Sequence, residues 1–352
     1  MNEIMFSVPM LAKHRSAEFE AVMASKTKPT RSLGVIEDVA LRLCLIQDSV
    51  RPQITEPTIV VFAADHGIAA EGVSAYPQSV TAAMVQNFLG GGAAINVLAR
   101  QSQADLVVVN AGVKTAMSNH PQLINTPVGP GTKNFLHGPA MSTDQLDTAM
   151  LRGRDVVDQI WQRGCNTIGF GEMGIGNSSS AAVLMSLICN MPLTTCVGPG
   201  TGLGDEGVRH KIAKLELAMA RAPRLESAQE IMAYFGGFEL AMMTGAMLRA
   251  GELGMTQLVD GFCATAALLV AVALEPNLKD YCFYSHQSAE PGHAAALRHL
   301  QAEALLRFSM RLGEGTGCAM ALPMLRMAAA IMCDMATFDE AQIAQKLKGE
   351  QI

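Results

Sequence analysis

The chain has 352 residues, of which 49% are hydrophobic, and a formal net charge of −6. This length can bury a large core, either as one domain or as one domain with a small companion. The acidic balance and the lack of a run rich in lysine and arginine exclude a typical nucleic-acid-binding surface. We therefore expect a small-molecule partner and no nucleic acid.

The sequence predicts neither a signal peptide nor a membrane span, and its cysteines do not indicate disulfides or zinc. The first thirty residues alternate charged and apolar positions, so they do not predict a signal peptide. The most apolar stretch, residues 261–274, is too short to cross a bilayer. Eight cysteines form no CxxC pair and lie mostly in apolar runs, which favours buried reduced thiols over disulfides or zinc. We expect a cytoplasmic protein without membrane contact and without a bound metal.

Short β-branched runs alternate with helical patterns along the chain, as in a parallel sheet with crossover helices. Strands are predicted at 58–62, 105–109, 166–170, 257–259 and 281–284, with a weak one at 195–197. Helices are predicted at 80–100 with a break at three glycines, at 144–163, from the turn after 170 to about 189, at 206–221, at 262–274 and up to about 335. The predicted fold is α/β, a Rossmann-like and mostly parallel sheet flanked by helices.

Helical patterns at both chain ends predict a small helical domain built from the two ends. We place residues 1–50 in this small domain and residues 51–305 in a large α/β nucleotide-binding domain. Residues 306–352 then carry a glycine-rich acidic loop and the C-terminal helices that return to the small domain.

Glycine-rich turns connect strands to helices at 171–178 and 198–207, and a third glycine cluster occupies 313–317. Glycines at such turns let a ligand approach the backbone and leave the first N–H groups of the helix aimed at an anion, so phosphate is the expected ligand. Tight structural connections are the alternative, which the repetition disfavours. Lys211 can reach back to a phosphate from the helix after the second turn, although a solvated helix face explains a lysine there equally well.

The type of phosphate ligand is narrowed by motifs that are missing. Residues 169–174 formally match GxGxxG, but 186–200 holds no acid for a ribose, so NAD is disfavoured. The sequence has no GxxxxGK[ST] element, which disfavours a P-loop nucleotide hydrolase. It also lacks a strand ending in two adjacent carboxylates before a Thr-Gly turn, which disfavours a magnesium-diphosphate donor. A monophosphate is favoured.

Two glutamates lie in glycine-rich surroundings, Glu172 in the first turn and Glu314 between Gly313 and Gly315. A flat ligand can approach Glu314 closely, and burial without a cationic partner would raise its pKa and keep it basic enough to take a proton near neutrality. A structural ion pair between Glu314 and Arg311 is the alternative.

Polar and aromatic residues also follow the first predicted strand, where open α/β sheets place ligands. Asp65 and His66 could suggest a metal, but no second cluster has ligand spacing, so bracing hydrogen bonds are favoured. Downstream, Tyr76 and Met84 would suit a planar aromatic guest, although core packing explains Met84 equally well.

Six ordered segments between about residues 60 and 320 resemble the nicotinate-nucleotide:dimethylbenzimidazole phosphoribosyltransferase (CobT) family. They are ADHGIAAEGVSAYPQSVT, NFLGGGAAINVLAR, GFGEMGIGNSSSAA, GPGTGLGDEGV, SHQSAEPG and MRLGEGTG. The resemblance implies transfer of the phosphoribosyl group from nicotinate mononucleotide to 5,6-dimethylbenzimidazole, giving α-ribazole 5′-phosphate and nicotinate for the lower ligand of cobalamin. It also implies a homodimer that needs no cofactor.

By this resemblance, Glu314 is the general base and Glu172 a second carboxylate near the reacting ribose. The nucleotide and phosphate would be held by Gly174, Gly176, Asn177, Ser178, Gly200, Thr201, Gly202, Gly204, Lys211 and Ser288. The base would lie against Tyr76, Met84 and Leu312. Attack opposite to nicotinate would invert the β-linkage at C1′ to α.

The chain departs from the family near the N-terminus, where it reads Lys28-Pro-Thr-Arg-Ser-Leu-Gly34 in place of the common KPPGSLG. This departure leaves the expected fold unchanged and the role of that loop open. The sequence also leaves open which base is preferred among benzimidazoles, purines and phenolics. Two other classes are weighed. An idle mononucleotide- or azole-binding protein should have lost an acid or glycine at these turns, and an NAD oxidoreductase should have its ribose acid.

Overall fold

The computed structural model describes residues 5–344, which divide into two compact units. Of these residues, the larger unit comprises 5–9 and 55–322, and the smaller comprises 10–54 and 323–344. The sequence-based division at 50/51 and 305/306 differs from this at its edges. Residues 306–322 belong to the larger unit because the Glu314 turn is hydrogen-bonded to the end of a sheet strand at Glu172. The assignment of separate roles to two domains stays a prediction.

The larger unit is built on a seven-stranded sheet, counted within residues 5–344, with the order β3-β2-β1-β4-β5-β6-β7. Every neighbouring pair is parallel. The strands are β1 (Thr58–Ala64), β2 (Asp105–Gly112), β3 (Leu123–Asn125), β4 (Thr167–Met173), β5 (Thr256–Val259), β6 (Cys282–His286) and β7 (Ala304–Leu306). The predicted α/β class with a parallel sheet is therefore confirmed.

The strand predicted at 195–197 is wrong, because Leu193–Cys196 forms the short helix α7. Leu193 and Cys196 are its buried residues, and their spacing of three places both on one side of a helical turn. The two short outer strands β3 and β7 were not predicted.

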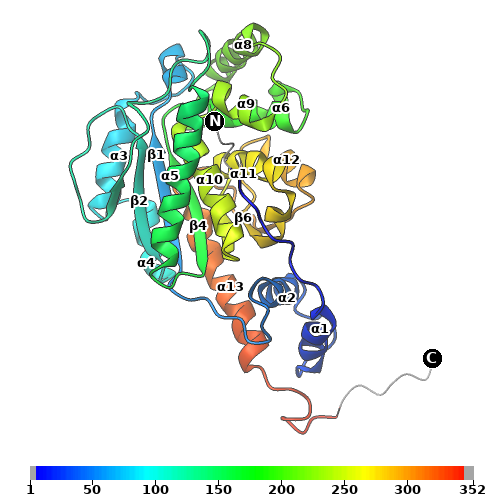
Figure 1. The fold of residues 1–352 in the computed structure, drawn as a ribbon. Helices are drawn as coiled ribbons and strands as arrows, with labels where there is room; N and C mark the ends of the chain where they lie inside the picture. The colour runs from blue at the N-terminus through cyan, green and yellow to red at the C-terminus, as the bar shows by residue number, and fades with distance from the viewer. Residues whose placement is uncertain (1–4, 345–352) are drawn as a thin grey trace. The chain divides into compact units, whose positions relative to one another are not determined.

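Helices alternate with the strands and cover the sheet of the larger unit (Figure 1). They are α3 (Ser79–Leu89), α4 (Ala94–Gln101), α5 (Thr143–Trp161), α6 (Asn177–Ile188), α8 (Asp205–Arg221), α9 (Ala228–Phe235), α10 (Phe238–Glu252), α11 (Phe262–Leu274), α12 (His293–His299) and α13 (Thr316–Asp334). Two 3-10 helices, η1 (Gly67–Glu71) and η2 (Pro276–Tyr281), complete the connections. The expected break in the helix at 80–100 is the gap between α3 and α4.

Glycines set how closely the buried helices approach. Helix α10 contacts β1, β2, β4 and β5, and α5 packs on its outer side. At Gly153 of α5 and Gly245 of α10, an added Cβ would lie closer than van der Waals contact to a backbone carbonyl oxygen of the other helix. The two backbones therefore meet directly, which fixes α10 against the centre of the sheet.

The strand order reverses between β1 and β4. From β1 the chain continues outward to β2 and β3, and it then returns to β4 on the other side of β1 and proceeds to β7. In open parallel sheets, ligands bind outside the carboxyl ends of the strands at such a switch point. The turn at 174–176 leaves the end of β4 at this point and leads into α6.

The smaller unit holds α1 (Ser16–Ser25), α2 (Val35–Gln47) and the C-terminal part of α13. The loop that departs from the family is fixed within this unit by two ion pairs. Lys28 and Glu37 form a buried pair at 2.9 Å, and Arg31 bonds Asp38 through two exposed contacts of 2.6 and 2.9 Å. The two residues at 28 and 31 thus brace the start of α2.

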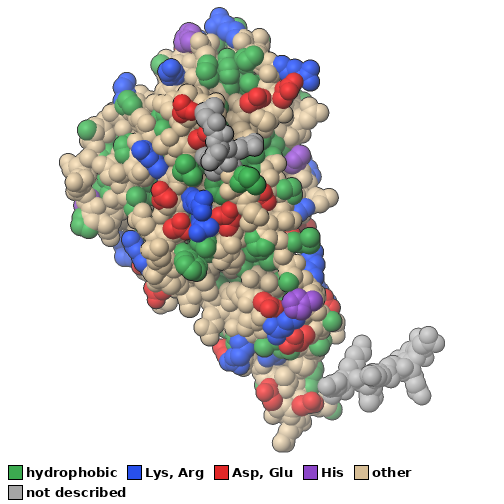
Figure 2. All heavy atoms as spheres, viewed as in Figure 1, with side chains coloured by type: hydrophobic (Ala, Val, Ile, Leu, Met, Phe, Trp, Pro, Cys, Tyr) green, Lys and Arg blue, Asp and Glu red, His purple; other side chains and the backbone are tan. Residues whose placement is uncertain are grey.

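Two helical stretches, Ser79–Gln101 and Thr316–Asp334, are long and apolar enough to cross a membrane by composition alone. The first is interrupted by the residues between α3 and α4, and both are partly buried in the fold, as core helices commonly are. On the face drawn in Figure 2, lysine and arginine side chains are scattered among acidic ones. The eight cysteines, all within the described residues, are unbridged, and six of them are buried.

Candidate functional site

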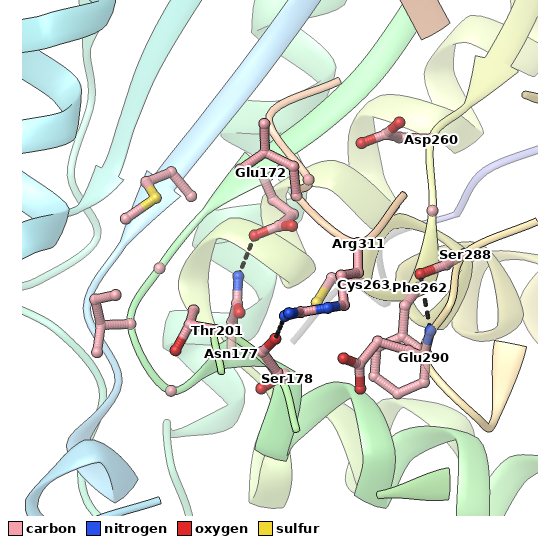
Figure 3. Close-up of a pocket in the computed structure, with 18 of the residues that line it drawn as sticks. Glu172, Asn177, Ser178, Thr201, Asp260, Phe262, Cys263, Ser288, Glu290 and Arg311 are labelled. Atoms are coloured by element: carbon pink, nitrogen blue, oxygen red, sulfur yellow. Dashed lines mark hydrogen bonds between the residues drawn. The ribbon is translucent and has the colours of Figure 1, made fainter. Parts of the chain in front are cut away.

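A cleft of about 690 Å³, counting its open mouth, lies in the larger unit among segments that follow β4, β5 and β6. Figure 3 shows the labelled side chains converging on it from these separate segments. Of the expected site residues, it is lined by Glu172, Gly174, Gly176, Asn177, Ser178, Gly200, Thr201, Ser288 and Leu312.

One side of the cleft has features that suit an anion. Gly176 precedes α6 with a φ of 99°, which a glycine adopts without strain, and α6 then begins at the cleft with Asn177 and Ser178. The ammonium of Lys211, a buried residue of α8, donates to the hydroxyl of Ser178 at 2.9 Å. A helix N-terminus and a buried cation therefore act on the same place.

Lys211 reaches this place through the interior and does not itself line the cleft. Burial lowers its pKa to about 8, and the nearby charge of Glu290 opposes that shift. The alternative of a solvated helix face is excluded, because the side chain is buried. A bound anion would give the buried ammonium a counter-charge in place of the hydration that burial removes.

Glu172 is the next-to-last residue of β4 and lines the same cleft, with only 9% of its surface exposed. The amide of Asn177 donates to one of its oxygens. Burial raises the pKa of Glu172 to about 8, and the charges of Glu239, Asp260 and Glu314 add to this, while the Asn177 bond lowers it. The group thus keeps its proton far more readily than an exposed glutamate.

Glu314 lies directly beside Glu172. Its N–H donates to the carbonyl oxygen of Glu172 at 3.1 Å, and at Gly313 an added Cβ would collide with the carboxylate of Glu172. Glu314 is buried, and its Oε2 has no hydrogen-bond partner within the described residues. Burial raises its pKa to about 7, the charge of Asp260 adds to this, and the N–H of Ile95 opposes it. The cleft surface itself is formed by the neighbouring Gly313.

The alternative pairing of Arg311 with Glu314 is not found among the described residues. The guanidinium of Arg311 donates instead to the carbonyl oxygen of Gly200 at 2.7 Å (Figure 3). Arg311 therefore connects the segment before the 313–317 turn to the glycine turn at 198–207, and it does not pair with Glu314.

The GxGxxG match has a packing explanation. Gly169 and Gly171 lie within β4, where an added Cβ at 169 would lie 2.9 Å from the Cβ of Cys318 and one at 171 would collide with the backbone of Gly315. These glycines make room for the Glu314 turn and the first turn of α13. They are not a loop around a pyrophosphate.

Several expected residues lie outside the cleft lining. Gly202 and Gly204 belong to the second turn but not to its cleft-facing part. Tyr76 is 54% exposed and Met84 is half-buried on α3, and neither lines the cleft. Leu312 lines it and is 55% exposed. Ser288 lines it, and its N–H donates to Nδ1 of His293 at 2.8 Å.

Asp65 and His66 serve as braces, as favoured from the sequence. His66 bonds Glu239 at 2.6 Å and Ser180 at 3.1 Å, and Asp65 accepts from the N–H of Lys114 at 2.8 Å. Within residues 5–344 no group of three or more histidine, cysteine, aspartate or glutamate side chains is placed to hold a metal ion.

Sequence reasoning missed three polar residues of the cleft: Asp260, His286 and Glu290. Asp260 directly follows β5, so a carboxylate at the carboxyl end of a predicted strand was the available signal. Glu290 is buried, and burial raises its pKa while the charge of Lys211 opposes that shift.

Comparison with known proteins agrees with this geometry. A family model described as phosphoribosyltransferase matches residues 8–343. Nicotinate-nucleotide–dimethylbenzimidazole phosphoribosyltransferases from Cupriavidus taiwanensis and Aromatoleum aromaticum are 50% and 48% identical, over 96% and 92% of this chain and 97% and 94% of theirs. The crystal structure of CobT from Thermus thermophilus superposes with a TM-score of 0.91 at 42% identity, covering 94% of this chain and 99% of that one. The chain therefore belongs to the nicotinate-nucleotide–dimethylbenzimidazole phosphoribosyltransferase (CobT) family and is an enzyme of that type, a transferase of cobalamin biosynthesis.

Proposed function

We propose that this enzyme transfers the 5-phosphoribosyl group of nicotinate mononucleotide to 5,6-dimethylbenzimidazole or a related base, releasing nicotinate and α-ribazole 5′-phosphate. The observation that carries the proposal is a cleft that combines the Ser178–Lys211 site with the buried carboxylate of Glu172, beside which the turn of the buried Glu314 is hydrogen-bonded. The first suits a phosphate, and the two carboxylates suit the cationic sugar and the proton of the incoming base.

The donor requires little from the protein at its leaving group. Nicotinate departs from a quaternary pyridinium that is already positive, so the C1′–N bond breaks with its electron pair moving onto a ring nitrogen that becomes neutral. No acid is needed to protonate that nitrogen, and no diphosphate has to be neutralised. The protein's work is to hold the phosphate and to stabilise positive charge at C1′.

Glu314 acts as the general base in this proposal. One benzimidazole nitrogen forms the bond to C1′, and the ring becomes cationic until its other nitrogen loses a proton. With a pKa raised to about 7, the carboxylate of Glu314 is a stronger base than an exposed glutamate and is still substantially ionised near neutral pH. Attack on the face opposite to nicotinate gives inversion from β to α.

Glu172 has an electrostatic role. Its pKa of about 8 keeps the carboxyl largely protonated at neutral pH in the empty cleft. A bound pyridinium nucleotide brings positive charge beside it and favours the ionised form. Once ionised, it stabilises an oxocarbenium-like C1′ more than the ground state.

The base would lie at the open mouth of the cleft, near Leu312, with Tyr76 and Met84 as further candidates. Leu312 is 55% exposed and Phe308, four residues earlier, is 56% exposed. Such apolar surface suits a second subunit, so we propose a cytoplasmic homodimer that completes this mouth. Sedimentation of the purified protein tests the dimer.

The direct test mixes the protein with nicotinate mononucleotide and dimethylbenzimidazole in the presence of EDTA. We expect free nicotinate and α-ribazole 5′-phosphate in equal amounts, and neither product when the base is omitted. An idle binding protein would bind the nucleotide without releasing nicotinate, and that result would refute the proposal. Replacing the base with purines or phenolics then ranks its specificity.

A further inference from the structure

The turn that carries Glu314 has an unusual backbone. Gly313, Glu314 and Gly315 have φ values of 83°, 64° and 79°, so three consecutive residues occupy the left-handed region. A residue other than glycine in this region costs about 1 kcal/mol or more, so the surrounding structure has to hold it.

Asp260 supplies two of the side-chain bonds that hold this turn, and the hydroxyl of Thr316, which donates to the carbonyl oxygen of Gly313 at 2.8 Å, supplies another. The Oδ2 of Asp260 accepts the N–H of Gly315 at 3.0 Å and its Oδ1 accepts the N–H of Gly317 at 2.7 Å. The carboxylate is only 2% exposed. It thereby bridges the left-handed turn and the first residues of α13, where a negative charge also suits the helix dipole.

The carboxylate of Asp260 is closely surrounded by its neighbours. An added Cβ at Gly317 would lie 2.6 Å from its Oδ1, and one at Gly261 would lie 2.8 Å from Nε2 of His286. His286, at the end of β6, has this Nε2 3.5 Å from Oδ1 of Asp260. The carboxylate therefore lies close to the backbone at Gly317 and to the imidazole of His286.

The charged groups around Glu314 come from several elements. Asp260 follows β5, His286 ends β6, Glu172 is the next-to-last residue of β4, and α4 contributes the N–H of Ile95. Glu239 of α10 and Asp260 both act on Glu172. The negative charge of Asp260 raises the pKa of both glutamates; for Glu314 its contribution is smaller than that of burial and than the opposing bond from Ile95.

We propose that Asp260 is a positioning residue of the transfer reaction, whose carboxylate fixes the backbone of residues 313–317 and so directs Glu314 at the incoming base. This inference rests on the proposed function, because it acts through Glu314 as the general base. The negative charge of Asp260 also raises the pKa of Glu314. Removing this charge should therefore both loosen the turn and lower the pKa of Glu314, and the two effects can be measured separately.

The test compares D260N with wild type. An amide keeps the size of the side chain but removes the charge and presents a donor to one of the two backbone N–H groups. We expect kcat to fall about 10- to 100-fold, as a small misplacement of a reacting group does, with KM for nicotinate mononucleotide within about threefold. The midpoint of the rise of kcat/KM with pH should move down by about one pH unit. A wild-type kcat, or a lower kcat with an unmoved midpoint, overturns the proposal.

A double-mutant cycle shows whether Asp260 acts through Glu314. In an E314Q background, D260N should cost less than about threefold further in kcat. An equally large additional loss would give Asp260 an independent role and overturn the proposal. If D260N does not fold, D260E keeps the charge and shifts the carboxylate by one methylene. It should then lower kcat with the pH midpoint unmoved, and a wild-type kcat in D260E overturns the proposal.

Amide hydrogen exchange separates this proposal from the proposed function, because it needs no substrate. In D260N the side-chain oxygen can still accept one of the two N–H groups, so at least one of the amides of Gly315 and Gly317 should exchange at least tenfold faster than in wild type. Unchanged protection of both amides overturns the proposal. If wild type releases no nicotinate while these amides respond as expected, the proposed reaction fails and the fixing of the turn stands.

Discussion

The two sides of the cleft use glycine for opposite reasons. In the turns at 174–178 and 200–201, glycines let the backbone line the cleft beside Ser178 and the buried Lys211, the side that we propose holds the phosphate. In the turn at 313–315 and in β4, glycine makes room for carboxylates and permits a left-handed backbone. The first side holds Lys211 and Arg311 with one buried carboxylate, Glu290, and the second side holds three buried carboxylates, although both sides appear in the sequence as glycine-rich segments.

The comparison teaches that the residues between the glycines decide the chemistry. The anion side holds Ser178 near Lys211, and the acid side holds Glu172, Glu314 and Asp260 with no lysine or arginine paired to them among the described residues. In the empty cleft, burial disfavours the charged forms on both sides, since it lowers the pKa of Lys211 and raises the pKa of Glu172 and Glu314. A ligand with a phosphate at one end and a cationic ring at the other relieves both, so the sides should fail differently when altered.

The largest expected effect is on the acid side, in E314Q. Loss of the proton acceptor should reduce kcat about 10²- to 10⁴-fold, the usual contribution of a general base. KM for nicotinate mononucleotide should change little, because the anion side is untouched. Steady-state nicotinate release measures both constants. The matched control is E303Q, at an exposed position eleven residues earlier, which should behave as wild type. Wild-type turnover in E314Q would remove the base assignment.

On the anion side, K211M should affect binding instead. A lost charged hydrogen bond is worth about 1.5 to 3 kcal/mol, so KM for the mononucleotide should rise about 10- to 100-fold. The matching nucleoside without phosphate should show little change, and the preference for the phosphorylated donor should disappear. K214M is the control, since Lys214 lies on the same helix but pairs with Glu71 at 2.7 Å. An equal loss for both donors would contradict a phosphate role for Lys211.

A matched pair of glycines in the second turn gives a smaller effect. Gly200 has a φ of 54°, and an added Cβ there would lie 2.8 Å from the hydroxyl of Ser178. Gly204 has a φ of −73° and nothing within 4 Å of an added Cβ. G200A should raise KM for the mononucleotide about tenfold through strain of about 1 kcal/mol or more, and G204A should leave it unchanged. Equal KM values in the two variants would show that this turn does not shape the anion site.

Much of this arrangement could be predicted from the sequence, for identifiable reasons. The runs beginning near 58, 105, 166, 257 and 281 are apolar, rich in β-branched or aromatic residues and bounded by turns, so the central strands were predicted. The outer strands β3 and β7 have three residues each, too few to show a period. The run at 195–197 is equally short, and its helical spacing appears only once Leu193 is included.

The acid side was harder to predict than the anion side. A helix after a glycine turn is local in sequence, and so is the lysine that follows it. Asp260 bonds N–H groups 55 and 57 residues later, a pairing that no spacing within one sequence reveals. The glycines at 169 and 171 were ambiguous, because the same pattern serves close packing or a dinucleotide.

The smallest expected effect is on the pH dependence of the unfolding free energy, which we derive for Glu172 on the acid side. Because the pKa of Glu172 is raised to about 8, the folded protein holds a proton that the unfolded chain releases near its ordinary value of 4.5. Wild type should therefore lose stability as pH rises from about 5 to 8. E172Q cannot ionise, so its unfolding free energy should gain on wild type by about 1 kcal/mol or more over that range. Denaturant unfolding at pH 5 and pH 8.5 measures this difference, with E216Q at an exposed position of α8 as the control. If the difference in unfolding free energy between E172Q and wild type is the same at both pH values, Glu172 does not hold its proton in the folded protein, and its raised pKa is refuted.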